Sequence, residues 1–371
     1  MDRYRNILLA QLGDIGDVVL TTPTIRAVKE TYPQAQVSIM VRKPFGSLLR
    51  ADPFLHEVVE VEKPRGALWN FVLTYVSLVR RLRRARYDLV IDLRTGDRGA
   101  IICYCTGAEE RVGRQGGDKQ KWHDLLFTRV IRDPEVVPHV HPGADQSLRI
   151  VRPLGIDTPD SRPRLHVDPA DRSRALGLLT GCGLSPTGCW LTVNPFSRWS
   201  YKEWDSGKWG EVIDQLWRRY RIPALLIGDG NEFTRSETIV KGREGRVLNV
   251  AGKTTLGELV ALISMSTLHM GVDSAAPHIA AAVGTPSVTL HGPSDWRAWR
   301  MADDMQRVVS SDMPCVPCYH MGCDDSQQSC CMQQLTVEAV LQSVDELLRK
   351  TGLNRVSWEE ATCIINEGVK G

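Results

Sequence analysis

The sequence predicts an α/β protein made of two Rossmann-like domains that face each other across a cleft. Short β-branched runs alternate with longer amphipathic patterns, which is typical of parallel sheets covered by helices. The alternation stops in a polar passage with several prolines at residues 157–171 and then begins again. With 371 residues, the chain also exceeds the usual size of one hydrophobic core.

Composition excludes several classes of protein. Apolar residues make up 42% and charged residues 24% of the chain, as in ordinary globular proteins. The net charge of +2 argues against a nucleic-acid partner. The longest apolar stretch, near residues 71–79, is too short to span a bilayer, and the N-terminus lacks a signal-like core. We therefore expect a cytoplasmic protein, whose ten cysteines favour thiols or metal ligands over disulfides.

The first domain is predicted to cover residues 1–160. Its helical patterns include residues 23–32 and a long segment around 68–84. Between the helical patterns, β-branched runs predict strands at residues 7–12, 36–41, 57–61 and 88–93.

The second domain is predicted to cover residues 172–348. Trp209, Val212, Ile213, Leu216 and Trp217 share one face of its first long helix. Thr255 and Glu258 have capping-box spacing, and an amphipathic helix follows residue 336. The tail at 349–371 is expected to pack back on the first domain. Strands are predicted at residues 190–193, 224–227, 247–250, 268–272 and 287–290.

The loop after the first strand carries two carboxylates, Asp14 and Asp17, in LGDIGD. Its glycines, Gly13 and Gly16, do not form the G-x-G-x-x-G fingerprint of an NAD oxidoreductase. Two carboxylates would also repel a pyrophosphate. The loop therefore favours accepting a proton, although both side chains could instead cap the turn through bonds to the backbone.

The loop after the first strand of the second domain is rich in phosphate-binding groups. VNPFSRWSYKEW places Ser197, Arg198 and Lys202 just past the strand, where hydroxyls and cations suit a phosphate. A solvated loop is the alternative. Glu232 follows another strand end, where a carboxylate could bind ribose hydroxyls, although first turns of helices favour acids anyway.

The run HMGVDSAAPHIAAAVGTPSV predicts a strand followed by an anion-binding helix start. Asp273 and Ser274 end the strand, and small residues Ala275 and Ala276 follow. Small side chains there allow the backbone N–H groups to approach an anion closely. His278 in the first turn could bond a phosphate oxygen, or could be a packing residue.

Three motifs together resemble glycosyltransferase family 9, the bacterial ADP-heptose:lipopolysaccharide heptosyltransferases. They are G-D-x-x-x-x-x-P at residues 16–23, K-x-W at 202–204 and D-S-A-A-P-H at 273–278. The similarity covers nearly the whole chain and is greatest to enzymes of the heptosyltransferase III type. It implies a GT-B fold, an ADP-heptose donor in the C-terminal domain and a lipopolysaccharide inner-core acceptor. It also implies inversion at the anomeric carbon without a metal or other cofactor.

The resemblance also assigns roles to residues. Asp17 matches the general base, whereas Asp14 falls at a position that the family does not fix. Many members have Thr-Gly-Leu where this chain has Ser274, Ala275 and Ala276, so the Cβ of Ala275 restricts close approach of a phosphate. The donor-binding positions are Ser197 and Arg198 in the phosphate loop, Lys202 at the diphosphate, Glu232 at the ribose, Asp273 at the heptose hydroxyls, and Ser274, Ala275, Ala276 and His278 at the helix start.

A cysteine-rich loop at residues 314–331 has no role in this scheme. Cys315, Cys318, Cys323 and Cys330 could hold a structural zinc ion or an iron–sulfur cluster, although their spacing matches no standard motif. Reduced thiols and, less readily, disulfides are the other interpretations.

Two basic segments of the first domain are also open to interpretation. Five arginines within residues 80–86 end a helix and suit either solvent or an anionic inner membrane, where the acceptor's lipid is anchored. Arg111, Arg114, Lys119 and Lys121 lie in a Gly-rich basic segment that could grip acceptor phosphates or be a mobile surface loop.

Two other classes of function compete with a sugar transferase. A nucleotide-sugar epimerase of similar two-domain fold would need no second substrate. A non-catalytic nucleotide- or glycan-binding protein would need neither Asp17 nor Lys202, and the chain has both.

Overall fold

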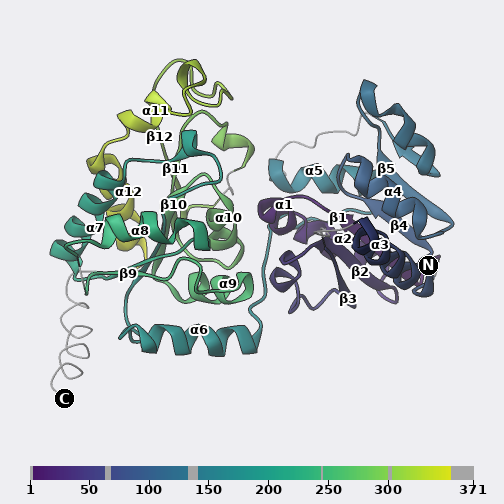
Figure 1. Cartoon of the computed structure of the whole chain (residues 1–371), viewed down its shortest axis with the longest axis horizontal. Helices are drawn as coiled ribbons and strands as arrows, with labels where there is room; N and C mark the ends of the chain where they lie inside the picture. Colours follow the sequence, from purple (N-terminus) through teal and green to yellow (C-terminus); the bar gives the residue numbers. More distant parts are fainter. Residues whose placement is uncertain (1–2, 63–67, 133–140, 244, 300–302, 352–371) are drawn as a thin grey trace. The chain divides into compact units, whose positions relative to one another are not determined.

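The chain folds into two α/β units (Figure 1). The computed structural model describes residues 3–62, 68–132, 141–243, 245–299 and 303–351, except the side chains of residues 68, 71, 118–121 and 325. Unit 1 is Met1–His166 and unit 2 is Val167–Gly371. The division falls inside the passage at 157–171 where the sequence predicts a linker. The predicted tail lies outside the described residues from position 352 onward.

Unit 1 contains a parallel sheet in the order β3-β2-β1-β4-β5-β6. The central strand β1 is buried along nearly its whole length, as expected when helices cover both faces of a sheet. The strands are β1 (Asn6–Gln11), β2 (Gln36–Arg42), β3 (Glu57–Val61), β4 (Leu89–Asp92), β5 (Glu110–Arg114) and β6 (Arg129–Ile131).

Two layers of helices cover the unit 1 sheet. One layer holds α1 (Ile15–Leu20), α2 (Thr22–Thr31) and α5 (Pro142–Val151), which pack on one another. The other holds α3 (Leu68–Arg84), α4 (Asp97–Cys105) and the 3-10 segment η2 (Asp118–Leu126). Leu78 and Leu82 of α3 join the core formed with Leu8, Val59 and Val90 of the strands. Short 3-10 segments η1 (Phe45–Leu48) and η3 (Arg152–Leu154) complete the unit.

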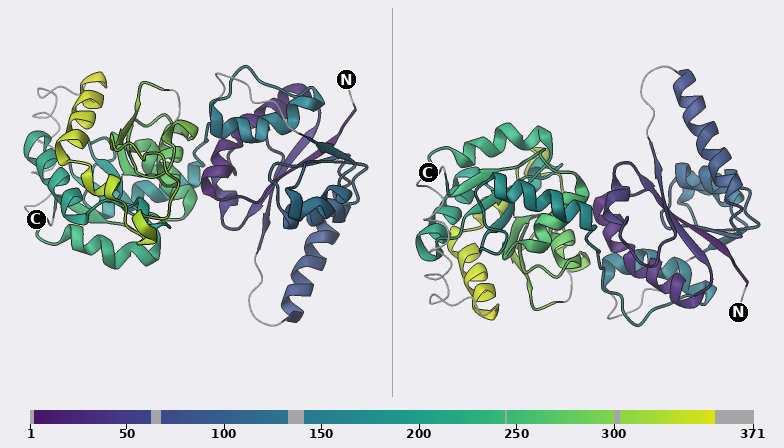
Figure 2. Two further views of the ribbon diagram at one scale, coloured as in Figure 1. Left: turned by 90° about the horizontal axis from the view of Figure 1, so that it is seen from above. Right: turned by 90° about the horizontal axis from the view of Figure 1, so that it is seen from below.

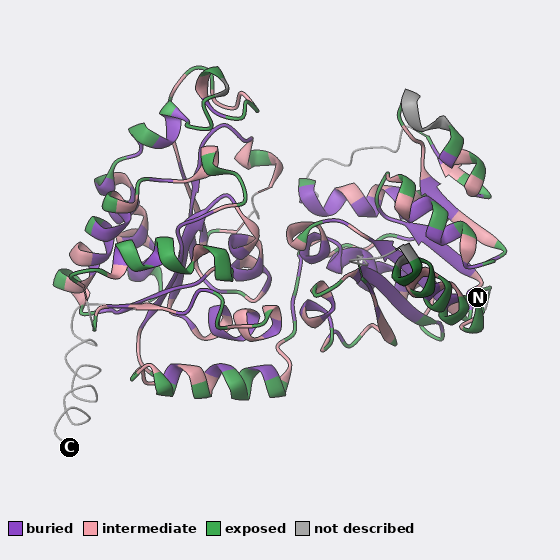
Figure 3. Cartoon of the chain, in the orientation of Figure 1, coloured by how far each residue is buried: buried purple, intermediate pink, exposed green. Residues whose placement is uncertain are grey.

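Unit 2 repeats this plan with a parallel sheet in the order β12-β11-β10-β7-β8-β9. In Figure 3 its central strands are buried, as is the central strand β1 of unit 1. The strands are β7 (Leu191–Asn194), β8 (Ala224–Leu226), β9 (Val247–Asn249), β10 (Leu268–Val272), β11 (Ser287–His291) and β12 (Gln306–Ser310).

Helices again form two layers on the unit 2 sheet. α6 (Pro169–Gly181), α9 (Leu256–Met265) and α10 (Ala275–Ala282) pack together on one side, and α7 (Ser206–Tyr220), α8 (Phe233–Val240) and α12 (Val337–Lys350) on the other. The predicted capping box is confirmed, because Thr255 N donates to Glu258 Oε2 at 2.8 Å and Glu258 N to Thr255 Oγ1 at 3.3 Å. The remaining elements are η4 (Ser200–Lys202), η5 (Gly230–Glu232), η6 (Trp296–Ala298), η7 (Cys323–Asp325) and α11 (Cys330–Gln334).

The structure confirms the predicted α/β class and the predicted strands to within one or two residues at each end. It also contains elements that the sequence pattern did not reveal, among them α1, β5, β6 and β12. These elements are short, and charged residues interrupt them. Neither the helical nor the strand spacing of apolar residues can therefore be recognised in them. Trp217 was predicted on the same face of α7 as Trp209 but is only half-buried, and Arg221 lies over its ring at 5.8 Å. Among the described residues, no helix is both long and apolar enough to cross a bilayer.

Candidate active site

Both sheets reverse their strand order next to the first strand of the unit. In unit 1 the reversal lies between β1 and β4, and in unit 2 between β7 and β10. Loops leave such a switch point in opposite directions and open a crevice at the carboxyl ends of the strands. Of the side chains predicted from sequence, Asp17 follows β1, Lys202 follows β7 and Asp273 follows β10.

Asp17 lies at the switch point of unit 1, in the first turn of α1. Its Oδ2 accepts a 2.8 Å bond from Asp14 N, so the predicted capping contact exists. Its Oδ1 pairs at 2.8 Å with Nη1 of Arg94, which lies just after the neighbouring strand β4. A Cβ on Gly13 would lie 2.4 Å from Asp17 Oδ2, so only glycine lets Asp17 fold back over the turn. Asp14 pairs with Arg42, and its side chain also accepts from the backbone N–H of Asp17, so both side chains cap the turn.

Asp92, the last residue of β4, is a second carboxyl group at this switch point, and sequence reasoning missed it. Its side chain is buried, and burial raises its pKa to about 8 even though Arg94 N donates to Oδ1 at 3.1 Å. The group is therefore mostly protonated near pH 7. A polar residue that ends a buried strand was the available signal.

Replacing Asp92 with asparagine is expected to remove a pH dependence of stability. A pKa raised in the folded state contributes stability that is present below the unfolded pKa near 4 and is lost as the pH rises through about 8. At about 1.4 kcal/mol per pKa unit, the wild type loses on the order of 5 kcal/mol across this range. Thermal unfolding of both proteins at pH 5 and pH 8 measures the difference, and equal pH slopes would contradict this assignment.

In unit 2, Lys202 and Asp273 are brought together at the switch point. Lys202 Nζ donates to Asp273 Oδ2 at 2.6 Å, and Ser294 Oγ donates to the same oxygen at 2.5 Å. Asp273 follows β10, Ser294 follows β11, and Lys202 ends η4, so three chain segments meet at one carboxylate. Ser294 was not predicted from the sequence.

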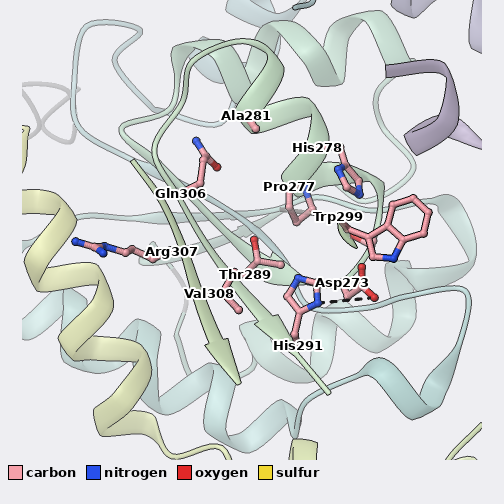
Figure 4. A pocket seen from close by; sticks show the side chains of 11 residues that line it. Asp273, Pro277, His278, Ala281, Thr289, His291, Trp299, Gln306, Arg307 and Val308 are labelled. Atoms are coloured by element: carbon pink, nitrogen blue, oxygen red, sulfur yellow. Dashed lines mark ion pairs between the residues drawn. The ribbon is translucent and has the colours of Figure 1, made fainter. Parts of the chain in front are cut away.

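The charge of Asp273 is maintained despite its burial. Burial raises its pKa, but His291 and Lys202, together with bonds from Lys202 and Ser294, outweigh burial and lower the pKa to about 2. His291 Nδ1 lies 4.0 Å from Asp273 Oδ2, the pair marked in Figure 4. Burial lowers the pKa of His291 itself to about 4, so its ring is neutral near pH 7. The positive charge beside Asp273 at that pH is therefore that of Lys202.

The start of α10 borders this carboxylate. Ser274 Oγ donates to Asn194 Oδ1 at 2.7 Å and makes no capping bond, so it leaves the first N–H groups of α10 to other partners. A small hollow, open to solvent, is lined by Asp273, Ser274, His278 and Trp299 among others (Figure 4). The His278 and Trp299 rings lie edge to face at 6.4 Å. Ala275 is half-buried and Ala276 buried.

The loop after β7 is held by a carboxylate that the sequence analysis did not single out. Glu203 Oε1 accepts a 3.1 Å bond from Ser197 N, and its carboxylate pairs with Arg235. Arg198 is exposed, with its guanidinium 6.0 Å from the Trp199 ring centre.

Glu232 follows β8, and its Oε2 accepts from Asp229 N at 3.0 Å. Burial raises the pKa of Glu232. The bond to Asp229 is the local capping contact that the sequence analysis left open for this residue.

The basic segment of unit 1 is partly a strand. Arg111 and Arg114 lie on β5, not in a loop as predicted, because the segment pairs with β4 and β6. Arg111 Nε donates to Leu126 O at 2.9 Å and Nη1 to Ala108 O at 2.6 Å, so its guanidinium is bound within the unit. The side chains of Lys119 and Lys121 lie outside the described residues.

The predicted cysteine candidates are thiols in this structure. Cys315, Cys318, Cys323 and Cys330 are unpaired, and Cys330 N donates to Cys323 Sγ at 3.4 Å. Within the described ranges, no three His, Cys, Asp or Glu side chains are arranged to hold a metal ion.

Comparison with known families decides the classification. The model of glycosyltransferase family 9 (heptosyltransferase) matches residues 75–328, more than half of the chain. The chain belongs to glycosyltransferase family 9. This confirms the family predicted from the three motifs, and with it the prediction that the protein is a glycosyltransferase.

Individual members of the family give the same result. Lipopolysaccharide heptosyltransferase 3 of Escherichia coli is 29% identical over 293 residues, which cover 76% of this chain and 83% of the relative. A family 9 glycosyltransferase from Veillonella parvula matches the structure with a TM-score of 0.80 at 20% identity, covering 94% of this chain and 99% of its own. The E. coli ADP-heptose lipopolysaccharide heptosyltransferase II matches with a TM-score of 0.74, at the same identity and coverage. The predicted GT-B fold is therefore confirmed.

Proposed function

We propose that this protein transfers a heptose from ADP-heptose to a sugar of the lipopolysaccharide inner core, with inversion at the anomeric carbon and without a metal ion. The observation that carries the proposal is the meeting of Lys202, Asp273 and the start of α10 at the switch point of unit 2. The family membership and the names of the relatives supply the class of donor and acceptor.

The donor is proposed to bind to unit 2. As the bond to the anomeric carbon breaks, negative charge develops on the departing ADP. Lys202 and the N–H groups at Ser274, Ala275 and Ala276 stabilise that charge, with Ser197, Arg198 and His278 as further donors to phosphate. Glu232 accepts from ribose hydroxyls, and Asp273, which stays ionised, accepts from heptose hydroxyls.

The acceptor is proposed to bind to unit 1, where Asp17 acts as general base. Asp17 removes the proton from the attacking hydroxyl as the hydroxyl oxygen bonds to the anomeric carbon, on the face opposite the departing ADP. The ion pair with Arg94 fixes the carboxylate orientation, while Asp17 Oδ2 faces the turn. Arg114, Lys119 and Lys121 are proposed to contact acceptor phosphates. The reaction requires Asp17 and Lys202 to act on the same pair of substrates.

Lys202 is proposed to supply the positive charge that a metal ion would otherwise provide to the departing diphosphate. Full turnover after exhaustive treatment with EDTA supports this part of the proposal. Loss of turnover that added divalent ions restore contradicts it, and leaves the donor assignment intact.

A ligand screen followed by product analysis tests the proposed function. Thermal shift against ADP, UDP and GDP should show stabilisation by ADP in preference to the others. Mass spectrometry of isolated core lipid, incubated with protein and ADP-heptose, should then show a gain of one heptose. An unchanged lipid with an altered free sugar nucleotide would instead indicate an epimerase, and unchanged substrates a binding protein.

A further inference from the structure

The helix α3 of unit 1 carries a second apolar face that points away from the protein. Trp69, Val72, Leu73 and Val76 are exposed, and their spacing of three and four residues places them in one stripe. The opposite stripe contains Leu78 and Leu82, which are buried in the core. Trp69 is 69% and Leu73 51% exposed, so α3 presents about two turns of apolar surface that its own unit does not cover.

The neighbouring elements extend this surface. α3 packs on α4, and α4 packs on η2, so the three form one layer of unit 1. α4 exposes Ile101 and Tyr104, and η2 exposes Trp122 and Leu125. Most of the large exposed apolar side chains in the described part of the chain therefore lie in this one layer. Exposed apolar side chains that gather on one layer indicate an interaction surface.

Positive charge continues the same stripe of α3. Arg80, Arg83 and Arg84 follow Val76 at helical spacing, and α3 contains no acidic residue. Arg83 Nε donates to Cys105 O at 3.0 Å, whereas Arg80 and Arg84 are exposed and make no ion pair with any described residue. Both views in Figure 2 show α3 standing out from the sheet of unit 1, with its start farthest away.

We propose that the outer face of α3, together with the exposed side chains of α4 and η2, docks unit 1 on the surface of an anionic phospholipid bilayer. Interfacial helices combine an apolar face holding Trp and Leu with arginines that reach lipid phosphates. Trp69 and Leu73 enter the boundary between headgroups and acyl chains, while Arg80 and Arg84 contact phosphates. A helix that protrudes in this way can enter a bilayer without a matching surface, whereas a protein partner needs a fitted one.

The inference is separable from the proposed function. The lipid-anchored acceptor of that function gives the docking a purpose, but docking itself requires no donor, acceptor or turnover. Vesicles without any saccharide therefore test it alone.

The test is co-sedimentation of the full chain with vesicles of phosphatidylcholine, with and without phosphatidylglycerol. We expect binding only when the anionic lipid is present. Replacing Trp69 and Leu73 together with serine should weaken binding at least about tenfold. Replacing Arg80 and Arg84 together with glutamine should weaken it about 25-fold at low salt, at about fivefold for each arginine. The matched control replaces Met321 with serine and Arg218 with glutamine, two exposed positions in unit 2, and should bind as wild type.

A second measurement uses the wild type only. Hydrogen exchange of the peptide covering α3 should slow when anionic vesicles are added, and exchange in unit 2 should not. Wild type that fails to bind anionic vesicles, or α3 variants that bind equally well, would overturn the proposal. So would a loss of self-association in the Trp69 and Leu73 variant with unchanged vesicle binding, because that result assigns the face to a second copy of the chain. Vesicle binding without heptose transfer would contradict the proposed function alone.

Discussion

Replacing Asp17 with asparagine is expected to lower the rate of heptose transfer by about 10²–10⁴ while ADP binding changes little. Asparagine has nearly the shape of aspartate, and its Oδ1 can still accept from Asp14 N, so the turn at Gly13 is retained. It has no basic oxygen to take the proton of the attacking hydroxyl. The measurement is transfer to core lipid under single-turnover conditions, together with calorimetric titration of ADP.

Asp14 provides the matched control. It lies in the same turn and is also a carboxylate, but it pairs with Arg42. Its side chain accepts from the backbone N–H of Asp17, as an asparagine side chain also can, and its own backbone N–H contacts the Asp17 carboxylate. Asp14→Asn should therefore change the rate less than about threefold. Arg94→Ala should give an intermediate loss, because it frees the orientation of Asp17 but leaves its carboxylate in place. Near-normal turnover of the Asp17 variant would remove this residue from the mechanism.

Most strands of the two sheets could be predicted from the sequence. Buried parallel strands are mostly apolar, as in residues 268–272, where His269 is the one polar side chain, and the structure places β10 at the same limits. The helix at residues 68–84 was equally well predicted, because seventeen residues give periodicity room to repeat. Segments of three to six residues, such as β6 and α1, carry too few positions for either period.

The individual segments of the candidate site were predicted from the sequence, but the contacts between residues of different segments were not. Asp17 and Arg94 are distant in sequence, and so are Lys202 and Asp273, so only the strand order shows that each pair meets. For the same reason Asp92 escaped notice, since its importance comes from burial beside β1 and not from any motif.

His291 and Ser294 were missed on a similar ground. His291 ends β11 and Ser294 follows it, neither in a recognisable pattern. They matter because β11 lies next to β10 and the carboxylate that follows β10. Polar residues at the carboxyl ends of strands neighbouring a switch point were the signal that could have found them.

Replacing Lys202 with alanine is expected to affect donor binding, turnover and stability together. Removing a cation that stabilises the departing diphosphate should cost about 10²–10³ in rate, with weaker ADP binding. It also leaves the carboxylate of Asp273 buried without its ammonium partner. Breaking a buried pair costs about 3–5 kcal/mol, and since the Lys202 side chain is 20% exposed we expect about 2–3 kcal/mol here.

Stability measured at acidic pH distinguishes the loss of this ion pair from a simple loss of packing. A carboxyl group with a lowered pKa contributes stability above its unfolded pKa near 4, and this contribution is lost as the pH falls through about 2. Without Lys202 the pKa of Asp273 rises, so the variant should lose less stability than wild type between pH 4 and pH 2. Thermal unfolding across this range measures the difference.

Two further variants separate stability from catalysis. Lys241→Ala removes an exposed lysine after α8 and should leave both stability and ADP binding unchanged. The double variant Lys202→Met with Asp273→Asn removes both buried charges, so stability should recover toward wild type while transfer stays low. If the double variant recovered its activity along with its stability, the ion pair would be structural and the charge that stabilises the departing diphosphate would have to come from another group. If only stability recovers, the loss of rate does not come from a destabilised fold, and the two charged side chains, Lys202 and Asp273, act on the donor itself.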